Sequence, residues 1–421
     1  MFLTKKTCSI FAVLVFGVQV FLACSDSNSE SSSVVQAPAE HQTSPEENTK
    51  DASVAADSSV ADDSSKVERS GLRTYILGDS AGRLISSDLY LDYPADSFLT
   101  EFDYGDIVTV AIAGYDTLEM PVVESAYDVP IAGFALMANR GSENIILSIH
   151  YGQMDDILGI TDVVTPIEVD ISMKDKGGFL FGLEMRSVQY MGTNKGNYPS
   201  LSIDEFANFR EVRTTGMGKN KLYRSSNPVD PCLGRNLVAD SLAKEAGVAT
   251  FINLADSEVD AKSFKGFDSS YYASQNAIFL AMPVEFFSKT FKDKLANGFR
   301  YMIEHDGPYL VHCTYGMDRT GWTIAVLEAL MGATVEEIQA DYAKTFSNYY
   351  YVVDGLQVAL NERQVDFFKS VVLRNLRAVY HAEGIETADE VKVDWSVATE
   401  KYLEKLGLSP EEISSLKDRL K

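Results

Sequence analysis

A ten-residue run near the three-quarter point of this 421-residue chain combines a cysteine, an arginine and a histidine. It reads His-Cys-Thr-Tyr-Gly-Met-Asp-Arg-Thr-Gly over residues 312–321, so five residues separate Cys313 from Arg319. The planar guanidinium of an arginine can bind two phosphate oxygens at once. A cysteine thiolate, which nearby positive charge favours, is a strong nucleophile. The spacing therefore predicts a phosphate-binding loop in which Cys313 attacks phosphorus.

The residues on both sides of this loop predict the elements that position it. Residues 308–311 form a short apolar run typical of a buried strand, and residues 322–331 are apolar and long enough for a buried helix. A loop between a strand and a helix N-terminus directs backbone N–H groups toward one point, where an anion can bind. The residues expected to bind the phosphate are Thr314, Tyr315, Gly316, Met317, Asp318 and Arg319.

The loop resembles the Cys-x5-Arg loop of the protein tyrosine phosphatase superfamily, with the histidine before it and the Thr-Gly after it that accompany it there. The resemblance extends from roughly Phe206 to the end of the chain and is to the bacterial secreted tyrosine and dual-specificity phosphatases. The other segments that carry it, in order, are Leu222–Pro228, Phe251–Glu258, Asp341–Tyr342 and Asn348–Tyr350.

This resemblance implies a tyrosine-phosphatase-like α/β fold and hydrolysis of phosphomonoesters through a phosphocysteine intermediate. The implied substrate is a phosphorylated protein or a small phosphoester, and neither a metal ion nor an organic cofactor is needed. Met317 stands where that family usually has lysine. The missing positive charge argues against a polyanionic phosphoinositide substrate but leaves the chemistry of Cys313 and Arg319 intact.

The mechanism also needs a carboxylic acid that protonates the leaving oxygen, and the sequence leaves a choice. Asp256 is the first candidate because it follows a predicted strand within Asn-Leu-Ala-Asp-Ser-Glu. Asp318, inside the loop itself, is the second. The remaining candidates are Glu258, Asp260 and Glu285.

Three further residues near the loop have expected roles. Thr320 is placed to hydrogen-bond the thiolate and help to expel it, although its hydroxyl could instead satisfy a backbone donor at the helix start. His312 is expected to orient the loop by hydrogen bonds rather than to transfer protons. Arg224 is expected either to bind the loop or substrate, or to form an internal ion pair.

The first residues predict export. Lys5 and Lys6 precede an apolar run over residues 10–23, which suits a secretory signal peptide over residues 1–23. The sequence Phe-Leu-Ala-Cys that ends at Cys24 resembles a bacterial lipoprotein box, which implies a lipid on Cys24 and attachment to a membrane. We therefore expect a lipid-anchored protein of the cell envelope, with ordinary secretion as the alternative.

Charge and cysteine content exclude other classes. The chain has 37 basic and 61 acidic residues and a net charge of −24, so nucleic acid is not an expected partner. Only Cys232 and Cys313 follow the signal region, which excludes a disulfide framework. Cys232 is interpreted either as a buried apolar residue or as a thiol that forms a reversible disulfide with Cys313.

Composition divides the rest of the chain into three parts. Residues 24–69 are rich in Ser, Ala and Asp and predict a disordered tether. Residues 70–185 predict an all-β, barrel-like domain, and the alternating strands and helices of residues 186–421 predict an α/β phosphatase domain with a parallel-rich sheet. The predicted strands of the first domain are 74–77, 107–112, 145–149 and 167–171, and the main predicted elements of the second are strands 248–254 and 278–283 and helices 236–246, 291–304, 335–346 and 357–382.

No metal site is predicted. Asp103, Asp106, Asp155 and Asp156 are carboxylates in predicted loops of an acidic protein, and solvated loop carboxylates explain them better than ligation does. Two other functions remain open: a pseudophosphatase that binds phosphorylated ligands without turnover, and a cell-surface binding module in which the β domain is the working part.

Overall fold

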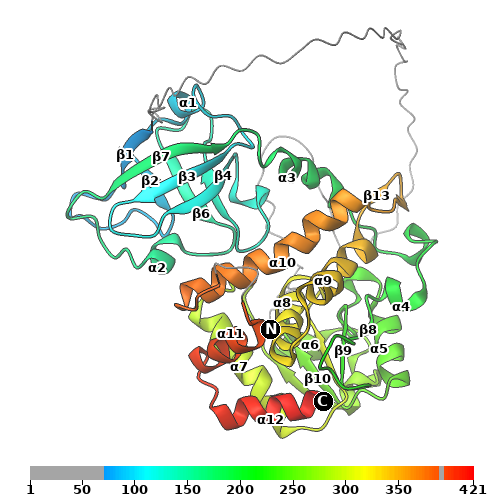
Figure 1. Cartoon of the computed structure of the whole chain (residues 1–421). Coiled ribbons are helices and arrows are strands. Elements are labelled where there is room, and N and C mark those ends of the chain that lie inside the picture. The colour runs from blue at the N-terminus through cyan, green and yellow to red at the C-terminus, as the bar shows by residue number, and fades with distance from the viewer. Residues whose placement is uncertain (1–70, 388–392) are drawn as a thin grey trace, which may run out of the picture. The chain divides into compact units, whose positions relative to one another are not determined.

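The computed structural model describes residues 71–387 and 393–421 (Figure 1). Residues Ser70–Lys421 belong to one compact unit. The predicted signal peptide, the lipid-bearing Cys24 and the tether lie outside the described residues, so these remain predictions. In the part of the chain that is described, no helix combines the length and apolar character needed to cross a membrane.

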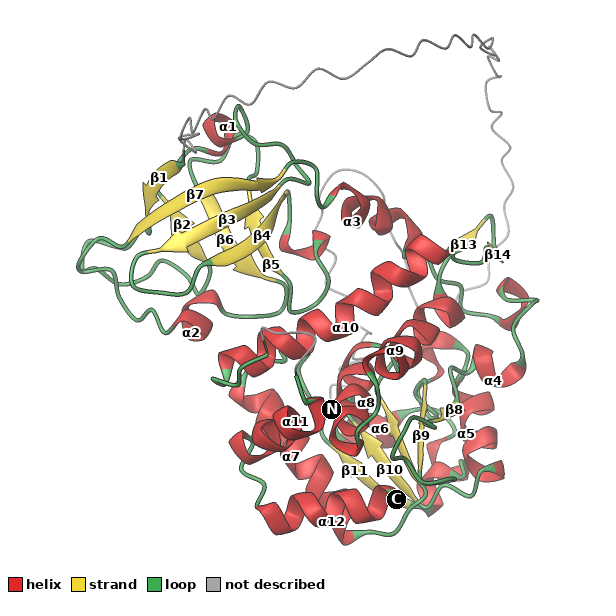
Figure 2. Cartoon of the chain, in the orientation of Figure 1, coloured by secondary structure: helices red, strands yellow, loops and turns green. Residues whose placement is uncertain are grey.

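The first third of the described chain forms a seven-stranded sheet with the order β1-β7-β3-β4-β5-β6-β2 (Figure 2). Neighbouring strands are antiparallel except β4 and β5, which run parallel. Hydrogen bonds from Leu77 N to Tyr90 O at 2.8 Å and from Asp92 N to Tyr75 O at 2.9 Å link the two edges, so the sheet comes close to closure. The strands are β1 Leu72–Tyr75, β2 Leu89–Leu91, β3 Ile107–Ile112, β4 Leu118–Val123, β5 Phe134–Met137, β6 Ile145–Ile149 and β7 Glu168–Asp175.

Alternation along the strands builds the core of this sheet. In β3, Val108, Val110 and Ile112 are buried, while the residues between them are only half-buried. The acidic loop residues have structural partners: Asp106 accepts a hydrogen bond from Lys176 Nζ at 2.9 Å, and the same lysine contacts Asp103. Within the described residues, no group of three or more His, Cys, Asp or Glu side chains could hold a metal ion.

The rest of the described chain, the α/β half of the fold, contains a five-stranded sheet with the order β11-β10-β12-β9-β8. The first four strands are parallel and β8 is antiparallel to β9, which is the arrangement of a mixed α/β fold with a parallel-rich sheet. The strands are β8 Arg210–Glu211, β9 Leu222–Ser225, β10 Thr250–Asn253, β11 Asn276–Phe279 and β12 Tyr309–His312.

Helices pack on both faces of this sheet (Figure 2). Consecutive residues of β12 enter different cores: Leu310 packs in a cluster with α5 and α6, whereas Tyr309 and Val311 pack with helices α7 to α12. Strands buried on both faces explain the continuous apolar runs in the sequence. The helices are α5 Asn236–Glu245, α6 Glu258–Ser263, α7 Lys289–Glu304, α8 Asp318–Met331, α9 Val335–Tyr349, α10 Glu362–Ala382, α11 Trp395–Lys405 and α12 Pro410–Leu420.

Several predicted boundaries differ from the structure, and two of them have a clear local cause. The strand predicted over residues 278–283 is β11 and ends at Phe279, because the chain turns at Ala281, which adopts a positive φ of 43°. The helix predicted from residue 357 begins only at Glu362, where Asn361 caps it by accepting a hydrogen bond from Gln364 N. A short hairpin of β13 Val352–Val353 and β14 Leu356–Gln357 occupies the preceding residues.

The β-rich region and the α/β region make apolar contacts with each other within the one compact unit. Ala132, which follows the seven-stranded sheet's β4, is buried in the large core of the α/β half. The rings of Phe134 and Phe287 lie 6.5 Å apart, and those of Phe181 and Phe367 lie 6.0 Å apart. Side chains of the β-rich region therefore pack against the α/β part of the chain.

Candidate active site

The cysteine loop occupies the carboxyl edge of the parallel sheet. Cys313 follows directly after β12 and is buried, and α8 begins at Asp318. Strands β9 and β10 end at the same edge. The segments that follow them bring Asn227 and Asp256 to the loop. Ligands of open α/β sheets bind outside the carboxyl ends of the strands, so this is the expected place for a phosphate.

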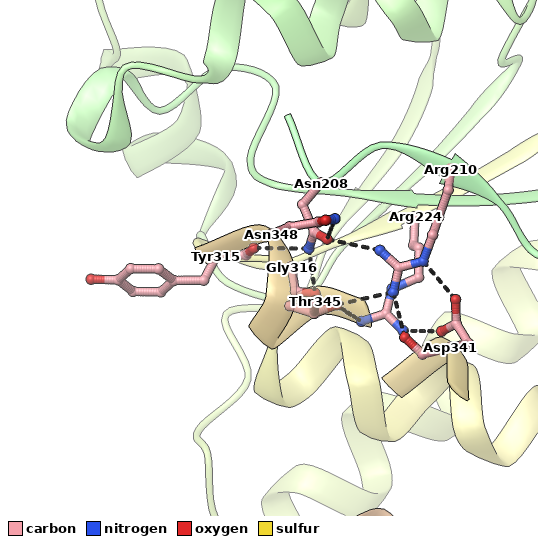
Figure 3. A network of polar contacts seen from close by, with 8 residues as sticks. All are labelled: Asn208, Arg210, Arg224, Tyr315, Gly316, Asp341, Thr345 and Asn348. Atoms are coloured by element: carbon pink, nitrogen blue, oxygen red, sulfur yellow. Dashed lines mark hydrogen bonds and ion pairs between the residues drawn. The ribbon is translucent and has the colours of Figure 1, made fainter. Parts of the chain in front are cut away.

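Side chains behind the loop hold its carbonyl groups (Figure 3). Arg224 Nη2 donates to Gly316 O at 2.9 Å, and Tyr349 Oη donates to Tyr315 O at 2.6 Å. Asn208 Nδ2 reaches both carbonyls, at 3.2 Å for Gly316 and 3.4 Å for Tyr315. Because N–H and C=O point in opposite directions across a trans peptide, these bonds direct the next N–H groups toward the other side of the loop.

The loop lies so close to β9 that one position accepts only glycine. Asn227 N donates to Thr314 O at 3.2 Å, which fixes a third loop carbonyl. Gly316 has a φ of 66°, and a Cβ there would lie 2.0 Å from Ser225 O. A side chain would therefore displace either the loop or the end of β9.

A buried ion-pair network fixes the guanidinium that holds Gly316. Arg224 is fully buried and pairs with Asp341, which also accepts from Arg210 Nε at 2.6 Å. Thr345 Oγ1 accepts from both arginines, at 3.0 Å and 3.2 Å (Figure 3). Burial raises the pKa of Asp341, but Arg210 and Arg224 outweigh it and hold this pKa at about 2. Arg224 thus both binds the loop and forms an internal ion pair. The two roles that the sequence offered as alternatives are both present.

The other predicted residues of the loop lie as follows. Arg319 is in the first turn of α8, and its Nη1 donates to Met282 O at 2.9 Å. Thr320 is buried, and its hydroxyl has no hydrogen-bond partner among the described residues. His312 Nε2 lies 3.2 Å from Tyr272 Oη. Burial, helped by the charge of Arg319, lowers the pKa of His312 to about 3, so its ring is neutral at physiological pH.

Asp256 is held beside the loop by two amides. Its Oδ2 accepts from Asn227 Nδ2 at 2.8 Å and from Asn253 Nδ2 at 3.0 Å. The residue that caps α6 is Ser257, so Asp256 is not an N-cap. The two amide contacts orient the carboxyl group.

Asp318 is the carboxyl group nearest to the arginine in sequence, at the first position of α8. Withdrawal from solvent raises its pKa to about 6, against the opposing charge of Arg319. A carboxyl group with this pKa is partly protonated in mildly acidic solution, as a proton donor must be.

The remaining acidic candidates have other contacts. Glu258 pairs with Lys262 on the exposed side of α6 at 2.6 Å, and Asp260 accepts from Ser257 Oγ at 2.7 Å. Glu285 lines a pocket of about 230 Å³, together with Lys289 and Lys292, and no residue of the cysteine loop lines this pocket. Cys232 lies partly exposed in the turn Pro231–Leu233.

Sequence reasoning missed part of the support behind the loop. Asn208, Arg210 and Thr345 were not predicted to act on it, and Tyr349 was noted only within a family-like segment. They belong to two segments far from the loop in sequence, residues 208–210 and α9, so no local pattern in the sequence connects them to the loop. The pairing of β8 with β9 and the packing of α9 bring them together.

Comparison with known proteins agrees with this geometry. The sequence profile described as "Tyrosine phosphatase family" matches residues 201–421, just over half of the chain. The chain belongs to the tyrosine phosphatase family. A comparison with curated protein sequences finds no significant match.

Three solved structures are similar to parts of this chain, each with a low sequence identity and a low TM-score. The catalytic core of the PP-IP phosphatase SIW14 from S. cerevisiae, in complex with citrate, is 17% identical, with 42% of this chain and 93% of that chain covered and a TM-score of 0.25. A cysteine-to-serine variant of TpbA from P. aeruginosa, in complex with pTyr, is 16% identical, with 42% and 94% covered and a TM-score of 0.26. An uncharacterized conserved protein from Thermotoga maritima is 18% identical, with 24% of this chain but only 35% of that protein covered and a TM-score of 0.19. The assignment therefore rests on the family match.

Proposed function

We propose that this protein is a cysteine-dependent phosphatase that hydrolyses phosphomonoesters through a phosphocysteine intermediate. The observation that carries the proposal is the loop itself, in which three consecutive carbonyls between Cys313 and Arg319 are held from behind. Membership of the tyrosine phosphatase family supports the same reaction. No step requires a metal ion or an organic cofactor.

In the proposed reaction, the thiolate of Cys313 attacks phosphorus and the bond to the leaving oxygen breaks. The leaving oxygen takes a proton from a carboxylic acid. Arg319 and the loop N–H groups, directed by the carbonyl contacts, stabilise the charge on the equatorial oxygens. Water then attacks phosphorus and gives a proton back to the carboxylate, the bond between phosphorus and sulfur breaks, and inorganic phosphate and the Cys313 thiolate are released, with the Thr320 hydroxyl available to stabilise the sulfur.

Asp256 is the proposed proton donor, because two amides orient its carboxyl group beside the loop. Asp318 is the competing candidate, because its raised pKa of about 6 keeps part of it protonated. His312 has the role of a positioning residue, since a neutral, fully buried ring cannot deliver a proton to substrate.

Phosphate release by the full chain and by Cys313→Ser tests the proposal. The wild-type protein should release phosphate from phosphotyrosine, while the serine variant should release none and still bind the phosphate analogue vanadate. Binding without turnover by the wild-type protein would instead identify a pseudophosphatase. Turnover by Cys313→Ser at the wild-type rate would exclude a cysteine nucleophile.

We further propose that the protein is exported and anchored to a membrane by a lipid on Cys24. The support is the sequence of residues 1–24, which lie outside the described structure. The wild-type protein should incorporate labelled palmitate and partition into detergent, and Cys24→Ala should do neither. Cys8→Ala is the matched control and should keep both properties. An unlabelled, water-soluble wild-type protein would favour ordinary secretion.

A further inference from the structure

A pocket of about 300 Å³ lies directly beside the phosphate loop. The loop supplies part of its wall, through Tyr315, Met317 and Asp318. In Figure 3 the ring of Tyr315 points away from the polar network behind the loop, which leaves it available to this pocket. Another part of the wall comes from the β-rich region, which contributes Tyr127 and His150. Residues outside the matched family segment of 201–421 therefore adjoin the catalytic loop.

Three rings of the β-rich region form a single aromatic cluster beside this pocket. His150 stacks on Tyr151 with ring centroids 4.7 Å apart, and Tyr127 meets both rings edge-on, at 5.0 Å from His150 and 6.0 Å from Tyr151. Val129 O lies 2.6 Å from His150 Nδ1 and fixes the imidazole. Burial lowers the pKa of His150, so the cluster carries no charge at neutral pH.

Both tyrosines of this cluster are exposed; Tyr127 lines the pocket, and Tyr151 packs against Tyr127 and His150 at its side. Tyr127 is 60% exposed and Tyr151 is 44% exposed, which is unusual for large aromatic side chains packed against other rings. Tyr151 also adopts a positive φ of 56°, a strained conformation for a non-glycine residue. Burial is the main cause that raises the pKa of Tyr151, and the charges of Asp318 and Arg319 also act on it, so its phenol lies near the catalytic loop.

The charge of the pocket selects against a second anionic group. None of the described residues that line it is Lys or Arg, and Asp318 is acidic. A further phosphate or carboxylate there would be unpaired in a protein that is already strongly negative. An uncharged aromatic group would instead find ring faces and edges, which attract one another in offset and edge-to-face geometries.

We propose that the β-rich region completes the substrate site, and that Tyr127 and Tyr151 bind the aromatic group to which the phosphate is attached. These residues then determine specificity for aryl phosphates over aliphatic ones. The inference rests on the proposed phosphatase function and deepens it, since the phosphate is bound by the loop and the ring by the β-rich region.

Kinetic measurements on the full-length chain test this assignment. Tyr127→Ala and Tyr151→Ala should each lower, by roughly threefold to tenfold, the ratio of kcat/KM for phosphotyrosine to kcat/KM for phosphoserine, an aliphatic phosphomonoester without a ring. The loss should appear mainly in KM for phosphotyrosine, because the ring is bound equally in ground and transition states. Tyr151→Phe should keep most of the preference. Tyr75→Ala is the matched control, because Tyr75 is 43% exposed on β1 and should keep the wild-type ratio.

A ratio that stays at the wild-type value in both alanine variants, with phosphate release intact, would overturn the inference and leave the proposed function standing. If the wild-type protein releases no phosphate from either substrate, the proposed function fails. The inference is then decided by calorimetric binding of phosphotyrosine to Cys313→Ser. Binding that weakens when Tyr127→Ala and Tyr151→Ala are added would support the aromatic site, and absence of binding would overturn it.

Discussion

Arg224 Nη2 lies 2.9 Å from the carbonyl oxygen of Gly316, so a buried guanidinium of β9 holds the backbone of the phosphate loop from the side opposite the substrate. A guanidinium fits this position because its fork can donate to the carbonyl and to Asp341 together. The positive charge behind the loop also adds to the field in which Cys313 would react. The geometry of the loop thus depends on an ion pair that never touches substrate.

Asp341→Asn should therefore impair both folding and turnover. The substitution removes the carboxylate that pairs with the fully buried Arg224 and the half-buried Arg210, and breaking a buried ion pair typically costs about 3–5 kcal/mol of stability. Loosening of the Gly316 carbonyl should lower kcat for phosphotyrosine when activity is measured well below the melting temperature. Asp293→Asn is the control, because Asp293 forms only an exposed pair with Lys289 and should change little.

Acid should diminish the effect of Asp341→Asn on stability. The folded-state pKa of Asp341 is about 2, below the ordinary value of about 3.9, so the ionised carboxylate stabilises the fold above pH 4. That contribution is lost as pH falls toward 2, and the difference in melting temperature between wild type and variant should shrink. Wild-type kcat in a destabilised Asp341→Asn protein would show that the ion pair serves stability alone.

Gly316→Ala should abolish phosphatase activity. The effect of the steric clash can be separated from the general cost of placing alanine at a positive φ. The new Cβ would lie 2.0 Å from Ser225 O, a backbone atom that cannot move without shifting β9. Gly247→Ala is the matched control, because Gly247 has the same φ of 66° but nothing within 4 Å of the added Cβ. The control should lose only about 1–2 kcal/mol in thermal unfolding and keep its phosphatase activity. Equal activity of the two variants would show that the loop tolerates a side chain at this position.

Sequence patterns anticipated the α/β half better than the β-rich half, for physical reasons. The parallel strands are buried on both faces, so residues such as 309–311 form continuous apolar runs that stand out. The strands missed in the β-rich half were β2, with three residues, β4, which contains Pro121, and β5, with four. Short strands carry too few alternations to be recognised, and a proline normally argues against a strand.

The candidate site could be predicted only where it is contiguous in sequence. Cys313 to Thr320 lie within one loop and the start of one helix, so their types and spacing were visible. The contacts of Asn208 and Tyr349 with the loop join residues 107 or 108 and 34 positions apart in the sequence, which no local pattern records. The aromatic cluster around His150 was likewise hidden, because a single histidine at a strand end looks like an ordinary packed side chain.

Leaving-group dependence should identify the proton donor. Loss of the donor should slow a poor leaving group much more than a good one, since only the poor one needs protonation in the transition state. If Asp256 is the donor, Asp256→Asn should lose about a hundredfold or more in kcat for phosphotyrosine but little for a nitrophenyl phosphate. Asp318→Asn should then show no such difference.

The pH profile gives an independent answer because Asp318 has a raised pKa of about 6. A proton donor acts only when protonated, so with Asp318 as the donor the kcat for phosphotyrosine should fall about tenfold for each pH unit above 6. Asp318→Asn would remove that fall, while Asp256→Asn would keep it. If Asp318→Asn shows both the flat profile and the leaving-group dependence, the proton comes from within the phosphate loop, and Asp256 serves only to hold Asn227 and Asn253 in place.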